Sequence, residues 1–227
     1  MRSRVLEDLG KYSGREGEKM KPASEYYLVD IDGTLTEYRA GASFELLHEN
    51  FLFPILRDLM VEKGWEKQQA EQEIFHLSKE EPFWDYSDYV AAFSLPVPEA
   101  FRRMRQWHMK NIVACPENVD LVRRLSAWGC KLFIMSNNPY LGCIFKLQVA
   151  GLANDDFSSP YFRRIFGTNL LRGCKSDPTV WKRAFAQIPV PVQEIGVIGD
   201  NPLEDGEIPH SLGVRDVLLL RHDPISE

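Results

Sequence analysis

The chain has 227 residues, of which 44% are hydrophobic, and this suits one domain with an insertion and a sizeable core. Its formal net charge of −6 argues against a general nucleic-acid binder, so we expect no nucleic-acid partner. No apolar run approaches the roughly 20 residues that a membrane helix needs, so we expect no membrane partner.

Residues 1–23 are rich in charge and have no apolar core, so we expect a flexible tail rather than a signal peptide. Met20 is an alternative start to Met1, because the first predicted strand begins only at Tyr26. The four cysteines form no Cys-x-x-Cys pair, which argues against a zinc site. They are predicted to be buried thiols of a reducing compartment, and we expect a cytoplasmic protein. These cysteines are Cys115, Cys130, Cys143 and Cys174.

The first predicted element is a buried strand over residues 26–31, which is rich in β-branched and aromatic residues. It delivers two aspartates, Asp30 and Asp32, to its carboxyl end, where open α/β sheets bind ligands, and Gly33 then breaks the strand. Two carboxylates this close repel each other, and a bound cation relieves the repulsion. An EF-hand is excluded, because Gly41 stands where the loop would need its final glutamate. An ordinary turn is the alternative for this motif alone.

The next long segment, residues 37–112, is predicted to be helical and is strongly aromatic. We expect helices over residues 45–63 with a bend at Pro54, within 65–78, over 85–93 and over 98–110. These helices would form an inserted domain between the first strand and the rest of the sheet.

A helix over residues 118–128 is predicted to precede a second buried strand, which ends at Ser136. Asn138 and Pro139 suit the cap and first position of a helix that runs to about residue 150. Ser136 would then lie beside a helix N-terminus, which is a ready anion site. Simple termination of the strand is the alternative.

Two further motifs follow in the carboxyl-terminal half. Lys175 precedes a helix start at Asp177 and Pro178, and Asp200 ends a buried strand over residues 194–199. Each could have a bland role, as a solvated lysine or a turn cap. Short strands over 163–166 and 215–220 complete a pattern that predicts an α/β fold with a parallel sheet flanked by helices.

Taken together, the motifs resemble those of the haloacid dehalogenase (HAD) superfamily. The chain has Asp-x-Asp-Gly-Thr at residues 30–34, Ser136 at a strand end, Lys175, and Gly-Asp at 199–200 followed by Asp205, in that family's order. The resemblance covers about residues 24–36 and 113–222. It implies a Rossmann-like core over 24–36 and 113–227, with an inserted α-helical cap of type 1 over 37–112.

The resemblance further implies a Mg²⁺-dependent phosphatase that acts on a small phosphorylated metabolite through an aspartyl-phosphate intermediate. Asp30 would be the nucleophile, and Asp32 would be the general acid and then the general base. The carboxylates of Asp30 and Asp200 and the main-chain carbonyl of Asp32 would hold Mg²⁺. Asp32 also favours an oxygen leaving group, because the family's dehalogenases lack an aspartate at this position.

The implied phosphate site consists of the Ser136 hydroxyl, the Lys175 ammonium and backbone N–H groups near Gly33 and Asn137. Asp205 would support the metal site or hold Lys175, and Glu204 is a weaker candidate for the same role. Specificity is expected to come from the cap, where the main candidates for substrate contact are Arg39, His48 and Trp84. Further candidates are Tyr38, Arg102 and His108.

Two alternatives stay open. A phosphomutase of the same family would use the same residues, and a non-catalytic binding protein could keep the fold. The intact set of motifs argues against the second, because loss of Asp30 or Lys175 would be expected there first. The motifs do not name the substrate, and the sequence is compatible with a monomer or a homodimer.

Overall fold

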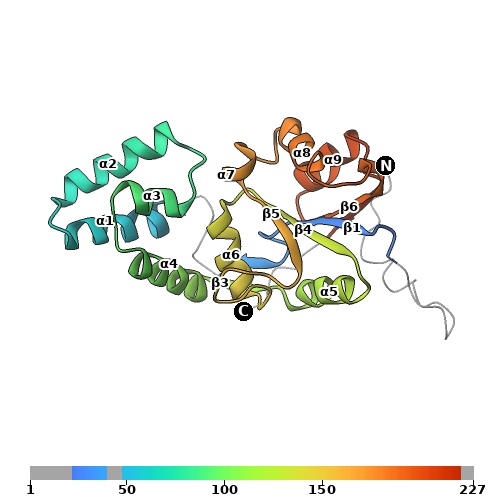
Figure 1. The fold of residues 1–227 in the computed structure, drawn as a ribbon, viewed down its shortest axis with the longest axis horizontal. Helices are drawn as coiled ribbons and strands as arrows, with labels where there is room; N and C mark the ends of the chain where they lie inside the picture. The colour runs from blue at the N-terminus through green and yellow to red at the C-terminus, as the bar shows by residue number, and fades with distance from the viewer. Residues whose placement is uncertain (1–21, 40–47, 221–227) are drawn as a thin grey trace.

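The structure is a computed structural model (Figure 1). It describes residues 22–39 and 48–220, except for the side chains of residues 48 and 49. The tail predicted for residues 1–23 therefore lies almost wholly outside the described residues. Within the described residues, no helix is both long enough and apolar enough to cross a membrane.

A five-stranded sheet forms the centre of the molecule, in the order β5-β4-β1-β6-β7, and every neighbouring pair is parallel. Its strands are β1 (Tyr26–Val29), β4 (Lys131–Met135), β5 (Phe162–Phe166), β6 (Ile195–Gly199) and β7 (Asp216–Leu219). The short apolar runs of the sequence become these strands because both faces of the sheet are covered. The predicted α/β class with a parallel sheet is confirmed.

Helices cover both faces of the sheet (Figure 1). On one face, Val29 and Ile134 pack with Val122 of α5 and Leu147 of α6. The other face packs on α8, where Trp181 is fully buried. The elements of these layers are α5 (Pro116–Ala127), α6 (Tyr140–Val149), α7 (Thr168–Leu171), α8 (Pro178–Phe185), η4 (Val192–Glu194), η5 (Pro202–Glu207) and α9 (Ile208–Ser211).

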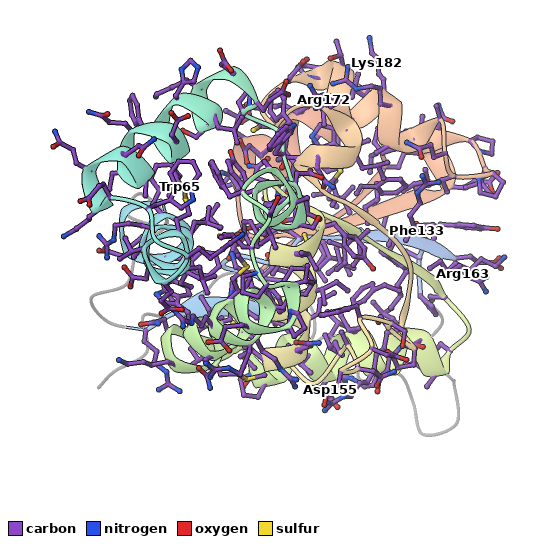
Figure 2. The ribbon with its side chains drawn as sticks, turned by 60° about the vertical axis from the view of Figure 1, so that its left-hand side comes forward. Trp65, Phe133, Asp155, Arg163, Arg172 and Lys182 are labelled. Atoms are coloured by element: carbon purple, nitrogen blue, oxygen red, sulfur yellow. The ribbon has the colours of Figure 1, made fainter. Side chains whose placement is uncertain are left out.

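The inserted segment forms a separate group of helices, which we call the helical unit. Its elements are η3 (His48–Leu52), α1 (Phe53–Glu62), α2 (Lys67–Glu80), α3 (Tyr86–Ala92) and α4 (Val97–Asn111). It has an apolar cluster of its own, to which α6 contributes Leu141 and Phe145. Trp65 lies between α1 and α2 in this unit (Figure 2). The antiparallel pair of β2 (Thr36–Tyr38) and β3 (Ile112–Ala114) joins the unit to the central sheet.

Three local predictions need correction. Pro54 lies near the start of α1, where a proline needs no N–H partner, rather than at a bend inside one α-helix, and the π-helical turn η3 precedes it. Pro139, not Asn138, occupies the N-cap position of α6 and makes no side-chain capping hydrogen bond, while the Asn138 side chain is engaged by Asp32. Cys174 is exposed and Cys130 is half-buried, so the cysteines are not all buried thiols.

Asp85 ties the helical unit to the core. It is the N-terminal cap of α3, and its Oδ1 accepts hydrogen bonds from the backbone N–H of Tyr86 (2.8 Å) and from that of Leu141 (3.1 Å) at the start of α6. Burial raises the pKa of Asp85 from 3.8 to about 6, although the two backbone donors lower it. One carboxylate therefore caps two helices from different parts of the fold.

We expect Asp85→Asn to remove a pH dependence of stability. A raised folded-state pKa means that the folded chain binds more protons than the unfolded chain between about pH 4 and pH 6, so wild-type stability falls as pH rises through that window. Asparagine keeps a capping oxygen without the buried charge. Above pH 6 the variant should be more stable by on the order of 2 kcal/mol, as measured by urea unfolding at several pH values.

Asp177→Asn provides the matched control at another helix cap. Asp177 is exposed at the start of α8, and hydrogen bonds from Thr179 lower its pKa. The contribution of Asp177 to stability should therefore depend on pH in the opposite direction. It is lost as pH falls through the lowered pKa. A stability difference for Asp85→Asn that does not change between pH 4 and pH 7 would contradict the account.

Candidate active site

The motif residues gather at the carboxyl edge of three adjacent strands. Ser136 follows β4, Asp30 follows β1 and Asp200 follows β6, and these strands are neighbours in the order β4-β1-β6. The Asp30 N–H donates to the Ile198 carbonyl at 2.8 Å, so the hydrogen bonding between β1 and β6 extends as far as Asp30. Since carboxyl ends of parallel strands share one edge, residues from distant parts of the chain converge there.

Lys175 forms a buried ion-paired centre with two aspartates. Its Nζ lies 2.6 Å from Asp30 Oδ1 and 2.7 Å from Asp205 Oδ1. Burial raises the pKa of Asp30 to about 7, while Lys175 lowers it and Asp205 raises it. Burial also lowers the pKa of Lys175, but the two carboxylates raise it more, so the net shift is upward. The lysine thus stays an ammonium between two groups that it stabilises as anions.

The backbone of Lys175 is fixed from two sides. Its N–H donates to Asn137 Oδ1 at 2.7 Å, and its carbonyl accepts from Trp181 Nε1 at 2.9 Å. Asn137 Nδ2 in turn donates to Glu204 Oε2 at 2.8 Å. The Asn137 side chain, just after β4, therefore links the end of this strand to Lys175 and to η5. The phosphate contact assigned to the Asn137 backbone stays a prediction.

Two roles were considered for Asp205, support of the metal site and a contact with Lys175. The structure contains the contact with Lys175. Asp205 lies on η5, and its second oxygen accepts from the Asn201 N–H at 3.2 Å. A Cβ on Gly199 would stand 2.3 Å from the Asp205 carboxyl, so only glycine allows this approach. Glu204 binds Asn137 and does not take the place of Asp205.

Gly33 makes room for Asp200. Its φ of +71° lies in the left-handed region, and a Cβ at this position would stand 2.2 Å from Asp200 Oδ2. The Gly33 N–H donates to the Thr36 carbonyl at 2.8 Å. What Gly33 offers here is space for a carboxylate, and its predicted contact with phosphate stays a prediction.

Thr34 is a site residue to which the sequence analysis gave no role. Its hydroxyl lies 3.1 Å from Asp30 Oδ2 and 3.4 Å from Asp200 Oδ1, between the two strands. Thr34 is completely buried, so no water competes for the hydroxyl. The threonine in Asp-x-Asp-Gly-Thr was the signal that could have identified it.

Asp30, Asp200 and Asp205 form the one acidic group in the described residues whose geometry could hold a metal ion. One carboxylate oxygen from each lies within 4.8 Å of the others. Burial raises the pKa of Asp200, and the nearby Asp30 raises it further. Clustered carboxylates with raised pKa values bind a cation in place of protons.

A second polar cluster surrounds Asp32. Its Oδ1 lies 2.6 Å from Lys146 Nζ, and its Oδ2 accepts from Asn138 Nδ2. Asn138 also donates to Ser136 Oγ, through Nδ2 at 2.8 Å and through its backbone N–H at 3.2 Å. Asp32 and Ser136 are therefore connected through one asparagine side chain. Sequence reasoning missed Lys146, although a lysine within the apolar run of α6 was a visible signal.

The candidates for substrate contact have different positions. Arg39 is exposed next to β2, and Trp84 packs edge-on against Tyr89 within the helical unit. The side chain of His48 lies outside the described residues. Of the further candidates, Arg102 pairs with Glu99 on the surface, and burial lowers the pKa of His108 to about 3. Tyr38 is the described candidate that reaches a site residue, with its OH 2.9 Å from Lys146 Nζ.

Comparison with solved structures identifies the fold. No protein-family model matches the chain, and no curated protein matches it. A HAD phosphatase from Thermococcus onnurineus has a TM-score of 0.50 at 21% identity, with 86% of this chain and 85% of that chain covered. A HAD family enzyme from Bacteroides thetaiotaomicron, in complex with magnesium and inorganic phosphate, has a TM-score of 0.51 at 12% identity, with coverages of 86% and 93%.

A third similar structure is a putative β-phosphoglucomutase from Thermotoga maritima, with a TM-score of 0.50 at 14% identity and coverages of 89% and 88%. The chain has the fold of the HAD superfamily, as the order of its motifs predicted.

Proposed function

We propose that the protein is a Mg²⁺-dependent phosphatase that hydrolyses a phosphomonoester of a small metabolite through an aspartyl-phosphate on Asp30. One observation carries the proposal. The Asp30 carboxylate is held by Lys175 on Oδ1 and by Thr34 on Oδ2, and it shares an acidic cluster with Asp200 at the carboxyl edge of the sheet. A buried carboxylate fixed at both oxygens at this edge is suited to act as a nucleophile.

The acidic cluster fits a magnesium ion. Its donors are carboxylate oxygens alone, which Mg²⁺ prefers. Asp30 and Asp200 would hold the ion together with the Asp32 carbonyl, whereas Asp205 is already engaged by Lys175 and Asn201. When bound, Mg²⁺ would supply positive charge that stabilises the phosphoryl oxygens.

In the proposed reaction, Asp30 forms the bond to phosphorus and Asp32 carries out both proton transfers. An oxygen of Asp30 forms a bond to phosphorus while the bond to the leaving oxygen breaks, and Asp32 gives that oxygen a proton. Water then attacks phosphorus, Asp32 takes a proton from the water, and the bond from Asp30 to phosphorus breaks. Ser136 and Lys175 would bind phosphoryl oxygens throughout.

The helical unit suits the role of a cap. We assign residues 37–112 to the cap and residues 24–36 and 113–227 to the core, with β2 and β3 as the connection between them. Tyr38 on β2 contacts Lys146, so the connection begins directly beside Asp32. A cap over the strand ends would exclude water from the phosphoryl group.

A panel of metabolite phosphates tests the proposal directly. We expect release of inorganic phosphate from one class of compound with Mg²⁺ and none with EDTA. A phosphate isomer in place of free phosphate would replace the phosphatase with a phosphomutase. No turnover of any compound, together with normal Mg²⁺ binding, would support the non-catalytic alternative.

Asp200→Asn tests the metal site separately from turnover. The amide keeps an oxygen for the Thr34 hydroxyl but removes one of the anionic ligands. We expect Mg²⁺ affinity to fall by about tenfold or more, as measured by isothermal titration calorimetry. The exposed Glu207→Gln, on the neighbouring η5, is the matched control and should bind Mg²⁺ like the wild type. Unchanged affinity in Asp200→Asn would exclude Asp200 as a ligand.

A further inference from the structure

A second buried lysine, Lys146, has no part in the chemistry described above. It lies on α6 within the apolar run from Leu141 to Leu147, and its side chain is 0% exposed. Lysine is almost never fully buried unless its charge is paired. An apolar residue at this position would avoid the free-energy cost of burying a charge. The contacts of the ammonium must therefore explain why a lysine is found here.

All three protons of the Lys146 ammonium have an acceptor. Its Nζ lies 2.6 Å from Asp32 Oδ1, 2.9 Å from Asn138 Oδ1 and 2.9 Å from the Tyr38 hydroxyl. The ammonium also stands over the Tyr38 ring, 4.9 Å from its centroid. The three partners come from the loop after β1, the loop after β4 and strand β2, so Lys146 is where these segments meet.

These contacts determine the position of the Asp32 carboxylate. Lys146 holds Oδ1, and Asn138 Nδ2 holds Oδ2, while Asn138 itself accepts from Lys146. The Asp32 side chain is 27% exposed, so part of it remains open to solvent. Without the two partners, an aspartate next to the turn at Gly33 could adopt several rotamers.

We propose that Lys146 is a positioning residue that orients the Asp32 carboxylate toward the leaving oxygen of the substrate. This inference rests on the proposed function, in which Asp32 moves the proton. A proton donor must lie within hydrogen-bond reach of its target, and a displacement of about 1 Å can cost about 10²-fold in rate. Tyr38 completes the arrangement from the strand that leads to the helical unit.

Leaving groups of different quality distinguish positioning from a structural role. A proton donor matters for an alkyl phosphate such as glycerol phosphate, but little for p-nitrophenyl phosphate, whose leaving group departs without a proton. We expect Lys146→Met to lower kcat by about 10²-fold on the alkyl ester and by less than about threefold on the aryl ester, with KM nearly unchanged. Asp32→Asn should show the same pattern, and adding Lys146→Met to it should cause no further loss.

Lys131→Met is the matched control. Lys131 Nζ also binds a tyrosine hydroxyl, that of Tyr26 at 2.8 Å, and it lies on β4, where it forms no ion pair with any acidic side chain among the described residues. We expect its rates to match the wild type on both esters. Should Lys146→Met fail to fold, Lys146→Gln serves instead, because a neutral amide is easier to bury. Equal losses on the two esters, or a further loss in the Asp32→Asn background, would overturn the proposal.

A crystal structure of the Lys146 variant separates this inference from the proposed function. If the wild type hydrolyses neither ester, the phosphatase proposal fails, but the position of Asp32 can still be observed. We expect the Asp32 side chain to move or to occupy more than one rotamer in the variant. An Asp32 side chain in its original place, still bound to Asn138, would overturn the role of Lys146 whatever the protein catalyses.

Discussion

Replacing Asp30 by asparagine is expected to lower kcat by about 10⁴-fold or more, because the amide cannot form the bond to phosphorus. Asp30 is the residue around which the site is built, since Lys175 and Thr34 hold its two oxygens. No neighbour in the described site can replace it, because Asp205 is engaged by Lys175 and Asp200 is the expected metal ligand. The rate is measured as phosphate release from the substrate that the panel identifies.

The fold should survive this substitution. Asparagine has nearly the same shape as aspartate, and Lys175 keeps its contact with Asp205 at 2.7 Å. Circular dichroism and thermal melting should therefore be close to those of the wild type. Wild-type rates in Asp30→Asn would exclude Asp30 as the nucleophile, whereas an unfolded variant would be uninformative and Asp30→Glu would then be tested.

Replacing Lys175 by methionine is expected to remove both activity and stability. The ammonium is the shared partner of Asp30 and Asp205, and all three groups are buried. Removing one partner of a buried ion pair typically costs about 3–5 kcal/mol, because a buried charge loses its compensation. We expect a loss of this size in the free energy of unfolding at neutral pH, and phosphate release close to background.

The stability loss should depend on pH with a definite sign. Lys175 lowers the pKa of Asp30, so its removal raises further a pKa that burial already places at about 7. The folded variant then binds more protons than the unfolded chain from about pH 4 to above pH 7, and its stability should fall as pH rises through that window. Lys182→Met is the control, since Lys182 points into solvent from α8 (Figure 2) and should have little effect. A Lys175 variant as stable as the control would contradict the ion-paired centre.

The core of the site could be predicted because its signals are local in the sequence. Asp30, Ser136 and Asp200 each follow an apolar run at once, and such runs become buried strands whose carboxyl ends share an edge. The order β4-β1-β6, which makes the three residues neighbours, is not written in any single run. The sequence predicts a parallel sheet but no order of its strands, and this order is seen only in the structure.

The second cluster could not be predicted in the same way. Asn138 before Pro139 is typical of a helix cap, but the Asn138 side chain binds Asp32 and Ser136 instead. A hydrogen bond to a charged carboxylate is stronger than one to a neutral backbone N–H. Lys146 appears in the sequence as one charged residue on an apolar helix. Two of its three partners, Asp32 and Tyr38, lie 114 and 108 residues away in the chain. Long-range pairing of this kind becomes visible only in three dimensions.

Chemical trapping of the intermediate would show whether Asp30 is the nucleophile. Enzyme in excess would be mixed with substrate labelled in the phosphoryl group, quenched with acid at successive times and digested to peptides. We expect transient label on the peptide that contains Asp30, its release by hydroxylamine as for an acyl phosphate, and no label in Asp30→Asn. Complete turnover by the wild type without label on that peptide at any time, or label that persists in Asp30→Asn, would contradict this role of Asp30.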